Sequence, residues 1–186
     1  KHAFARSLVN SGRLSMPCRY DNSPLNTPDV DGGPSELRPG SPAKDAPIRL
    51  EEEHAWLLNQ FGNGFVLLFD GRIGDRHADT LTSLLKELSE LLDHRTNLSI
   101  VVVGPASDEF SVLPRTTVID DTEGLVTQRY DLKAGSGYLI RPDQHVAARW
   151  HAITVHKINN ALDRALGVHL AGTADSTNQE RCHAQA

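Results

Sequence analysis

The sequence predicts an α/β domain, a mixed sheet flanked by helices, preceded by an extended proline-rich arm. Three observations lead to this prediction. Two short apolar runs enclose an amphipathic helix, a turn signal separates two further strand-like segments, and seven prolines lie between residues 17 and 47. The length of 186 residues fits one domain with extensions, since single domains commonly contain about 100–200 residues.

Residues 1–47 are interpreted as the end of a helix followed by the arm. Ala3–Val9 has helical character and Gly12 is a suitable stop. Each proline beyond it fixes its own φ and removes a backbone donor, which favours extended chain with turns. Two interpretations remain open: an arm that is disordered in isolation, or one that docks on a neighbour.

The first half of the core is predicted as helix, strand, helix, strand. Glu52–Phe61 has apolar residues at helical spacing, and Phe65–Phe69 has the continuous apolar pattern of a strand buried on both faces. Asp79 is a candidate cap for a helix over Thr80–His94, whose leucines form one stripe. A second buried strand is predicted over Leu98–Val103.

The second half is predicted as a hairpin and a closing helix. Pro142 presets the second position of a type I turn, so Tyr138–Ile140 and Val146–Trp150 are expected to pair. Ile153–Leu166 follows as a helix, and Gly167 ends it.

Between the halves, Thr116–Ile119 is predicted as a short strand and Asp120–Leu125 as a turn or brief helix. A β-α-β unit followed by an antiparallel hairpin and a closing helix is the thioredoxin-like topology. The expected boundaries are therefore an arm over 1–47, a thioredoxin-like domain over 48–170, and a flexible tail over 171–186.

The residues that carry thioredoxin chemistry are missing. A working thioredoxin has a Cys-x-x-Cys with a lowered thiolate pKa after its first core strand, but Asp70–His77 contains no cysteine. Ala134–Gly137, which matches the position of the cis-proline, contains no proline. Cys18 and Cys182 lie near opposite ends and form neither a disulfide framework nor a metal motif.

No other motif supports a catalytic, cofactor-binding or metal-binding residue, and none is assigned. The Gly71–Gly74 pair follows a strand but lacks the third glycine of a dinucleotide fingerprint. His151 and His156 are five positions apart, which does not place two imidazoles on one helix face. A hydrolase built on scattered His and Ser residues is a third hypothesis, which no Gly-x-Ser-x-Gly elbow supports.

The net charge of −5 comes without any basic block, which argues against nucleic-acid binding. The sequence has no apolar run near 18 residues, so no membrane span is predicted. The two separated cysteines fit a reducing cytoplasm.

Three stretches carry a family resemblance. They are Ser7–Ser15 with Ser23–Pro28, Pro39–Ala43 continuing through Trp56–Phe65, and Tyr138–Arg149, which is the most specific. They resemble the C-terminal region of class A FAD-dependent aromatic hydroxylases, the group of phenol hydroxylase and hydroxyphenylpropionate hydroxylase. Within the third stretch, Ala148 stands where many relatives have a bulkier aromatic residue.

The resemblance implies a parent enzyme that binds FAD, takes hydride from NADH or NADPH, and hydroxylates an aromatic ring with dioxygen. It also implies that this region folds as a thioredoxin-like domain without thioredoxin activity. The family's flavin motifs lie upstream, and Gly74-Asp75 has the wrong surroundings to be one of them. No flavin-site residue is therefore carried over to this chain.

Two hypotheses of different class follow. The first is a non-catalytic C-terminal domain that packs on the FAD- and substrate-binding body of a hydroxylase, shapes the access side, or contributes to a homodimer. The alternative is an independent thioredoxin-fold module that binds a ligand or protein without redox activity.

Overall fold

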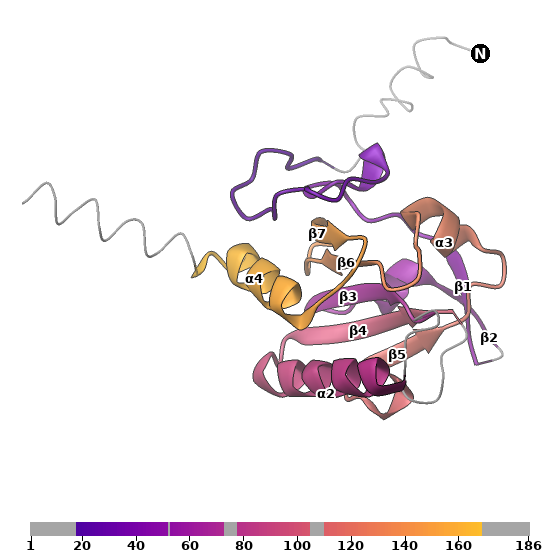
Figure 1. Cartoon of the computed structure of the whole chain (residues 1–186). Helices are drawn as coiled ribbons and strands as arrows, with labels where there is room; N and C mark the ends of the chain where they lie inside the picture. Colours follow the sequence, from indigo (N-terminus) through magenta and orange to yellow (C-terminus); the bar gives the residue numbers. More distant parts are fainter. Residues whose placement is uncertain (1–17, 52, 73–77, 105–109, 169–186) are drawn as a thin grey trace, which may run out of the picture.

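The computed structural model describes residues 18–51, 53–72, 78–104 and 110–168. It contains one five-stranded sheet and a separate two-stranded hairpin (Figure 1). In spatial order the large sheet consists of β5 (Thr116–Ile119), β4 (Leu98–Val103), β3 (Phe65–Asp70), β6 (Gly137–Ile140) and β7 (Val146–Trp150). The predicted helix end over Ala3–Val9 and the predicted tail over 171–186 lie outside the described residues.

The strand directions confirm the predicted β-α-β unit and hairpin. β3 pairs in parallel with β4, and helix α2 (Ala78–His94) connects them. β4 pairs in parallel with β5, while β6 runs antiparallel to both β3 and β7. The pairing of β6 with β7 shifts register between Leu139 and Ile140, so the hairpin carries a bulge.

Two hydrophobic layers cover the two faces of the sheet. On one face, α2 and α4 (Val155–Ala165) pack against residues such as Leu67 and Phe69. On the other, Val66 and Leu68 contact the arm, the hairpin and α3 (Figure 1). Successive residues of β3 therefore point into different layers, which explains why Phe65–Phe69 is apolar throughout.

The predicted helix over Glu52–Phe61 is wrong. The segment forms strand β2 (Glu53–Trp56), paired with β1 (Pro47–Leu50), and then a 3₁₀ turn over Leu57–Gln60. Of the apolar positions that indicated a helix, only Leu57 and Phe61 are buried. The antiparallel pairing with β1, which lies immediately before β2 in the sequence, overrides the helical spacing.

Strand β1 was not predicted, because residues up to 47 were assigned to the arm. Asp120–Leu125 was expected to be a turn or brief helix; a turn lies there, and the helix α3 that follows covers Leu125–Tyr130. The Asp121 carboxylate caps it, accepting hydrogen bonds from the backbone N–H groups of Val126 (3.0 Å) and Thr127 (2.8 Å). Asp79, expected before α2, lies within that helix.

Candidate functional site

The carboxyl end of β3, where a thioredoxin carries its cysteines, holds an ion pair instead. The Asp70 side chain is fully buried and accepts hydrogen bonds from the backbone N–H (2.8 Å) and Nε (2.9 Å) of Arg72. The guanidinium is half-exposed, and the hydrogen bond to Asp70 raises the pKa of Arg72 further above its usual value. This pair offers no nucleophile and no redox group.

The segment facing this pair is built for close packing. Ser136 accepts a hydrogen bond from the Asp70 backbone N–H (3.1 Å), and Gly137 begins β6. A Cβ at Gly137 would lie 2.9 Å from the Phe69 Cβ and 3.0 Å from the Leu68 carbonyl oxygen. No cis peptide occurs in the part of the chain that the structure describes. Steric fit therefore accounts for the glycine here.

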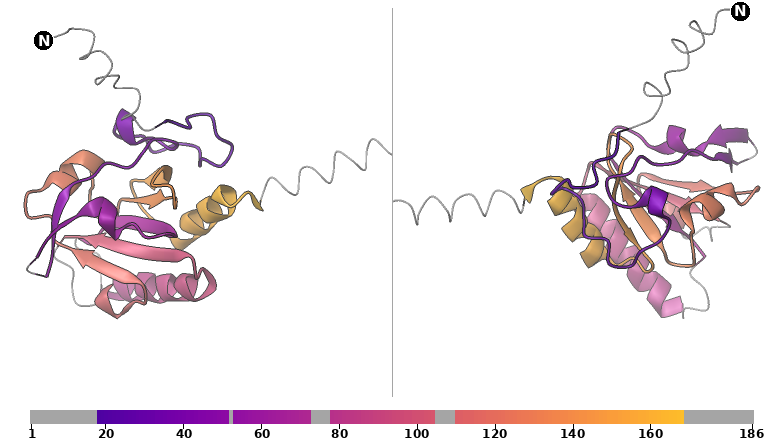
Figure 2. Two further views of the ribbon diagram at one scale, coloured as in Figure 1. Left: turned by 180° about the vertical axis from the view of Figure 1, so that it is seen from behind. Right: turned by 90° about the horizontal axis from the view of Figure 1, so that it is seen from above.

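The arm lies along the outer edge of β7 and the hairpin turn (Figure 2). Its backbone pairs with the hairpin: Thr27 N–H donates to the Ala147 carbonyl (2.9 Å) and Gly40 N–H to that of Val146 (2.8 Å). In return, Val146 N–H donates to the Ser41 carbonyl (2.8 Å). The arm thus satisfies the backbone groups of an edge strand that would otherwise invite pairing with another chain. The docked interpretation of residues 18–46 is the one the structure supports.

Arg149 on β7 binds the arm through its guanidinium group. Its side chain is only 5% exposed, and Nε and Nη2 donate to the two carboxylate oxygens of Asp29 at 2.9 and 2.5 Å. Nη1 donates to the Pro34 carbonyl at 2.6 Å. The hydrogen bonds from Arg149 hold the pKa of Asp29 below its usual range. A bidentate arginine–carboxylate pair with a further acceptor fixes both orientation and position.

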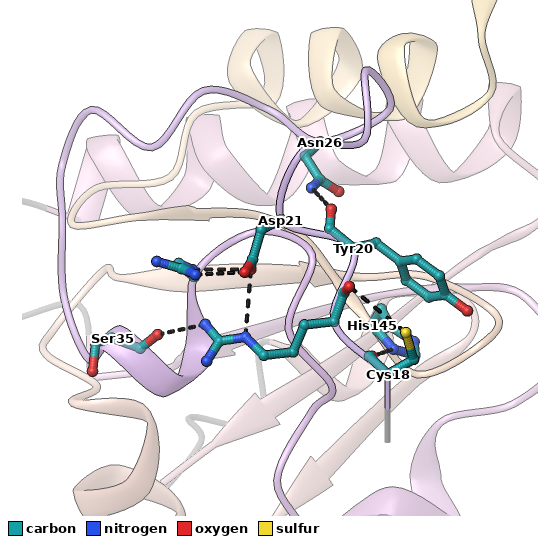
Figure 3. A network of polar contacts seen from close by, with 8 residues as sticks. Cys18, Tyr20, Asp21, Asn26, Ser35 and His145 are labelled. Atoms are coloured by element: carbon teal, nitrogen blue, oxygen red, sulfur yellow. Dashed lines mark hydrogen bonds and ion pairs between the residues drawn. The ribbon is translucent and has the colours of Figure 1, made fainter. Parts of the chain in front are cut away.

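The beginning of the arm is fastened at the hairpin turn (Figure 3). His145 is largely buried, with Nε2 2.8 Å from the Cys18 carbonyl oxygen and Nδ1 2.9 Å from that of Asp143. The Tyr20 ring packs on the imidazole with the ring centroids 4.8 Å apart, and the Arg141 guanidinium lies 5.8 Å from the Tyr20 ring centroid. The two ends of the docked segment are therefore held by different contacts.

Two buried tyrosines hold the other end of the arm. The Tyr130 hydroxyl donates to the Lys44 carbonyl (2.7 Å) and accepts from the Lys44 N–H (2.9 Å). The Tyr138 hydroxyl donates to the Tyr130 carbonyl (2.7 Å), and the two rings meet edge to face. Burial raises the pKa of both phenols, that of Tyr138 to about 12.

We expect Tyr138→Phe to reduce the loss of stability at high pH. The unfolded phenol has a pKa of about 10, so the stability from burying Tyr138 in neutral form is complete below about pH 10. It is lost as the pH rises towards the folded pKa of about 12. Urea unfolding at pH 7 to 11 measures the difference, and Tyr20→Phe, at an exposed tyrosine, is the control. Equal alkaline losses in both variants would contradict the assignment.

We expect Gly40→Ala to destabilise the arm by about 2 kcal/mol. Gly40 has φ +92°, and an added Cβ would lie 2.5 Å from the Tyr20 carbonyl oxygen and 2.7 Å from the Asn26 Nδ2. Thermal unfolding and hydrogen exchange of arm amides measure the effect. Gly62→Ala is the matched control, because a Cβ there meets nothing within 4 Å. Similar costs for both alanines would count against the tight turn.

The residues singled out in the sequence do not meet in one place. Cys18 is exposed, Cys182 and Gly74-Asp75 lie outside the described residues, and His151 and His156 are exposed on the surface. Across the described residues no group of three His, Cys, Asp or Glu side chains is suited to a metal ion.

The two tryptophans and Ala148 differ in how far they are buried. Trp150 is buried in the core, whereas Trp56 is about half exposed. Ala148 is fully buried in the layer beneath α4 and pairs with Leu139. The layer is therefore packed at this position by the small Ala148 side chain, and no aromatic ring is present there.

The ion pair between Asp29 and Arg149 was not predicted from the sequence. A signal was present on one side, since Arg149 is the single charged residue in the strand Val146–Trp150. A charge in such a strand requires a partner when it is buried. Asp29 carries no comparable signal, because it lies in an irregular polar arm.

The chain has a thioredoxin-like fold. No protein-family model and no curated protein matches its sequence. A thioredoxin-like protein from Bacteroides caccae matches 68% of this chain with half of its own length, at 17% identity and TM-score 0.51. A putative thiol:disulfide interchange protein DsbE from Chlorobium tepidum matches 70% of this chain with 99% of its length, at 16% identity and TM-score 0.52. The predicted fold class is confirmed.

Two flavin enzymes match a larger share of the chain. Aklavinone-11 hydroxylase, solved with FAD and aklavinone, matches 85% of it at 20% identity and TM-score 0.61. The flavin-dependent monooxygenase PieE, solved with FAD and substrate, matches 88% at 17% identity and TM-score 0.61. This chain corresponds to only 28% of the length of either enzyme. The resemblance seen in the sequence therefore has a counterpart in the fold of two FAD-dependent monooxygenases.

None of the helices in the described ranges combines the length and the apolar character needed to cross a membrane.

Proposed function

We propose that this chain is the C-terminal thioredoxin-like domain of an FAD- and NAD(P)H-dependent aromatic-ring hydroxylase, and that it acts by contact, not by chemistry. The observation that carries the proposal is the share of the chain that the flavin monooxygenases match. They match 85–88% of it, whereas the two thioredoxin-like proteins match 68–70%. The larger match favours a hydroxylase over a free-standing thioredoxin-like module.

The residues at the carboxyl end of β3, where a thioredoxin carries its cysteines, support a non-catalytic role. Asp70 and Arg72 neutralise each other at the end of β3, and Gly137 is packed against the core. An ion pair between a buried carboxylate and a half-exposed guanidinium stabilises a conformation and transfers no electrons. The roles left to the domain are packing on the FAD- and substrate-binding body, shaping the access side, or contributing to a dimer surface in the cytoplasm.

The described residues do not fit FAD or NAD(P)H. The glycine that follows β3 is Gly71, where a Cβ would lie 2.5 Å from the Val102 Cγ1. This glycine therefore serves the contact between β3 and β4, not a phosphate group. Both cofactors belong, in this proposal, to the body of the parent enzyme.

The proposal is tested on the natural reading frame that contains this sequence. We expect the full polypeptide to purify with stoichiometric FAD and to oxidise NAD(P)H with an aromatic substrate. Residues 1–186 alone should retain no flavin from an FAD solution and should reduce no insulin disulfides. Stoichiometric flavin on residues 1–186, or disulfide turnover by them, would contradict the proposal. A reading frame without a flavin domain would favour the independent binding module.

A further inference from the structure

We propose that His145 makes the docking of the beginning of the arm dependent on pH: residues 18–20 bind the hairpin most tightly when both imidazole nitrogens carry a proton. The contact joins the arm at Cys18 to the turn between β6 and β7 (Figure 3). All of its groups lie within this chain, so the inference holds whether or not a flavin-binding body precedes the domain.

Both ring nitrogens of His145 face backbone carbonyl oxygens. Nε2 lies 2.8 Å from the Cys18 carbonyl oxygen, and Nδ1 lies 2.9 Å from that of Asp143. A carbonyl oxygen only accepts hydrogen bonds, whereas a neutral imidazole has one N–H and one nitrogen lone pair. The neutral ring therefore donates to one of the two carbonyls and turns its lone pair towards the other. Only the imidazolium, with an N–H on each nitrogen, donates to both.

The burial of the imidazole makes this difference count. The His145 side chain is only 11% exposed, so a hydrogen bond that is not made at either nitrogen costs more than it would on the surface. Hydrogen bonds from a charged donor are also about twice as strong as those between neutral groups. The docked arm therefore favours the protonated ring over the neutral one.

The contact with the arm, not the contact within the turn, is the one that the neutral ring loses. Nδ1 is close to two acceptors of Asp143, the carbonyl oxygen and a carboxylate oxygen at 3.4 Å, whereas Nε2 faces the Cys18 carbonyl. The hydrogen bonds of a histidine determine which nitrogen keeps the proton, so the remaining proton stays on Nδ1. The lone pair of Nε2 then points at the Cys18 carbonyl oxygen, and the two repel each other.

The charged groups of the turn favour the protonated ring. The Asp143 carboxylate is in contact with Nδ1, and the Arg141 guanidinium, which opposes a second positive charge, pairs with the other oxygen of that carboxylate at 2.7 Å. Residues 41–43 run beside His145, with Pro42 bridged to it, and carry no titratable side chain.

The arm adds an aromatic ring and no free cation. The Tyr20 ring centroid lies 4.8 Å from that of the His145 imidazole, and a cation within about 6 Å of an aromatic ring is attracted to it. Arg19 pairs with the Asp21 carboxylate at 3.4 Å. The Cys18 thiol is exposed, and the contact with His145 uses the backbone carbonyl of that residue.

Hydrogen exchange of the Tyr20 amide in residues 1–186 tests the proposal, because this N–H donates to the Gly40 carbonyl (2.8 Å) while the beginning of the arm is docked. Histidine side chains in water lose their second proton at about pH 6.5. The protection factor, which corrects for the intrinsic exchange rate at each pH, should fall about tenfold from pH 5.5 to pH 8. The Thr27 amide is the internal reference and should keep its protection, since the Asp29–Arg149 pair beside it stays charged over this range.

Four variants separate a pH-dependent contact from a structural histidine. His145→Gln is neutral at every pH, so it should protect the Tyr20 amide weakly and equally at both pH values. Asp143→Asn removes the carboxylate that favours the protonated ring, so the protection should be lost at a lower pH than in the wild type. Cys18→Ser keeps the carbonyl, and His156→Gln replaces an exposed histidine; both should follow the wild type.

The proposal is overturned by equal protection of the wild-type Tyr20 amide at pH 5.5 and pH 8, or by an equal fall at Thr27. It is also overturned if His145→Gln keeps the wild-type pH dependence or if His156→Gln abolishes it. Should His145→Gln fail to fold, the wild-type protein and Asp143→Asn still decide, because a histidine with a structural role alone gives protection that neither pH nor the Asp143 charge shifts.

Discussion

Replacing Asp29 by alanine is expected to lower the free energy of unfolding by about 3 kcal/mol. The change removes the counter-charge of the Arg149 guanidinium, which is almost fully buried and keeps only neutral partners such as the Pro34 carbonyl. A buried charge without its counter-charge costs more than the pair itself contributes. Urea unfolding at pH 7 measures the effect, and the arm should separate from β7 before the sheet unfolds.

The double variant Asp29→Ala with Arg149→Met distinguishes a buried ion pair from a surface ion pair. Removing both charges should recover a large part of the loss, since no charge stays buried alone. A cost below about 0.5 kcal/mol for Asp29→Ala would mean that the pair behaves as an exposed salt bridge. That outcome would contradict the role given to Arg149.

The same pair also predicts a dependence on acid. Because Arg149 lowers the pKa of Asp29 in the folded state, the stability from this carboxylate is present above its unfolded pKa of about 3.9. It is lost as the pH falls through the lower folded pKa. Asp29→Asn should therefore lose less stability than the wild type between pH 5 and pH 2, and a parallel loss in both proteins would contradict the coupling.

Replacing Arg72 by alanine is expected to cost about 3 kcal/mol, although Arg72 itself is half-exposed. The reason lies in Asp70, whose side chain is fully buried and would keep only the backbone N–H of residue 72 as a described partner. Thermal and urea unfolding of residues 1–186 measure the cost.

Asp70→Asn in the Arg72→Ala background provides the control. The neutral amide has no charge to leave unpaired, so the double variant should be more stable than Arg72→Ala alone. Arg38→Ala removes a guanidinium from an exposed pair and should have a much smaller effect than Arg72→Ala. If Arg38→Ala and Arg72→Ala had equal effects, Asp70 would not need its counter-charge.

The core of the fold could be predicted because its patterns are local. β3 and β4 are largely apolar, α2 has one apolar stripe, and Pro142 marks the turn between β6 and β7. Each pattern shows which side chains of an element are buried, and this can be recognised without knowing what the element packs against. These segments carry the thioredoxin-like topology, so the fold class followed from them.

The Asp29–Arg149 ion pair could not be predicted because its two residues are far apart in the sequence. The β1–β2 hairpin is local, since Leu50 pairs with Glu53, and it was missed because its second strand also has helical spacing. Asp29 and Arg149 are 120 positions apart, and so are Asp31 and His151, whose backbone N–H donates to the Asp31 carboxylate at 2.9 Å. No local pattern encodes such pairs. The absence of thiols at the end of β3 could be seen in the sequence, but the ion pair that lies there could not be predicted from it.

Hydrogen exchange of the arm amides in residues 1–186 tests the docked arm most directly. We expect Thr27, Gly40 and Ala43, whose N–H groups donate to hairpin carbonyls, to exchange slowly in the wild type. In Asp29→Ala they should exchange much faster while the amides of β3 and β4 stay protected. Arm amides that exchange at the rate of an unfolded chain in the wild type, beside a protected sheet, would contradict the account.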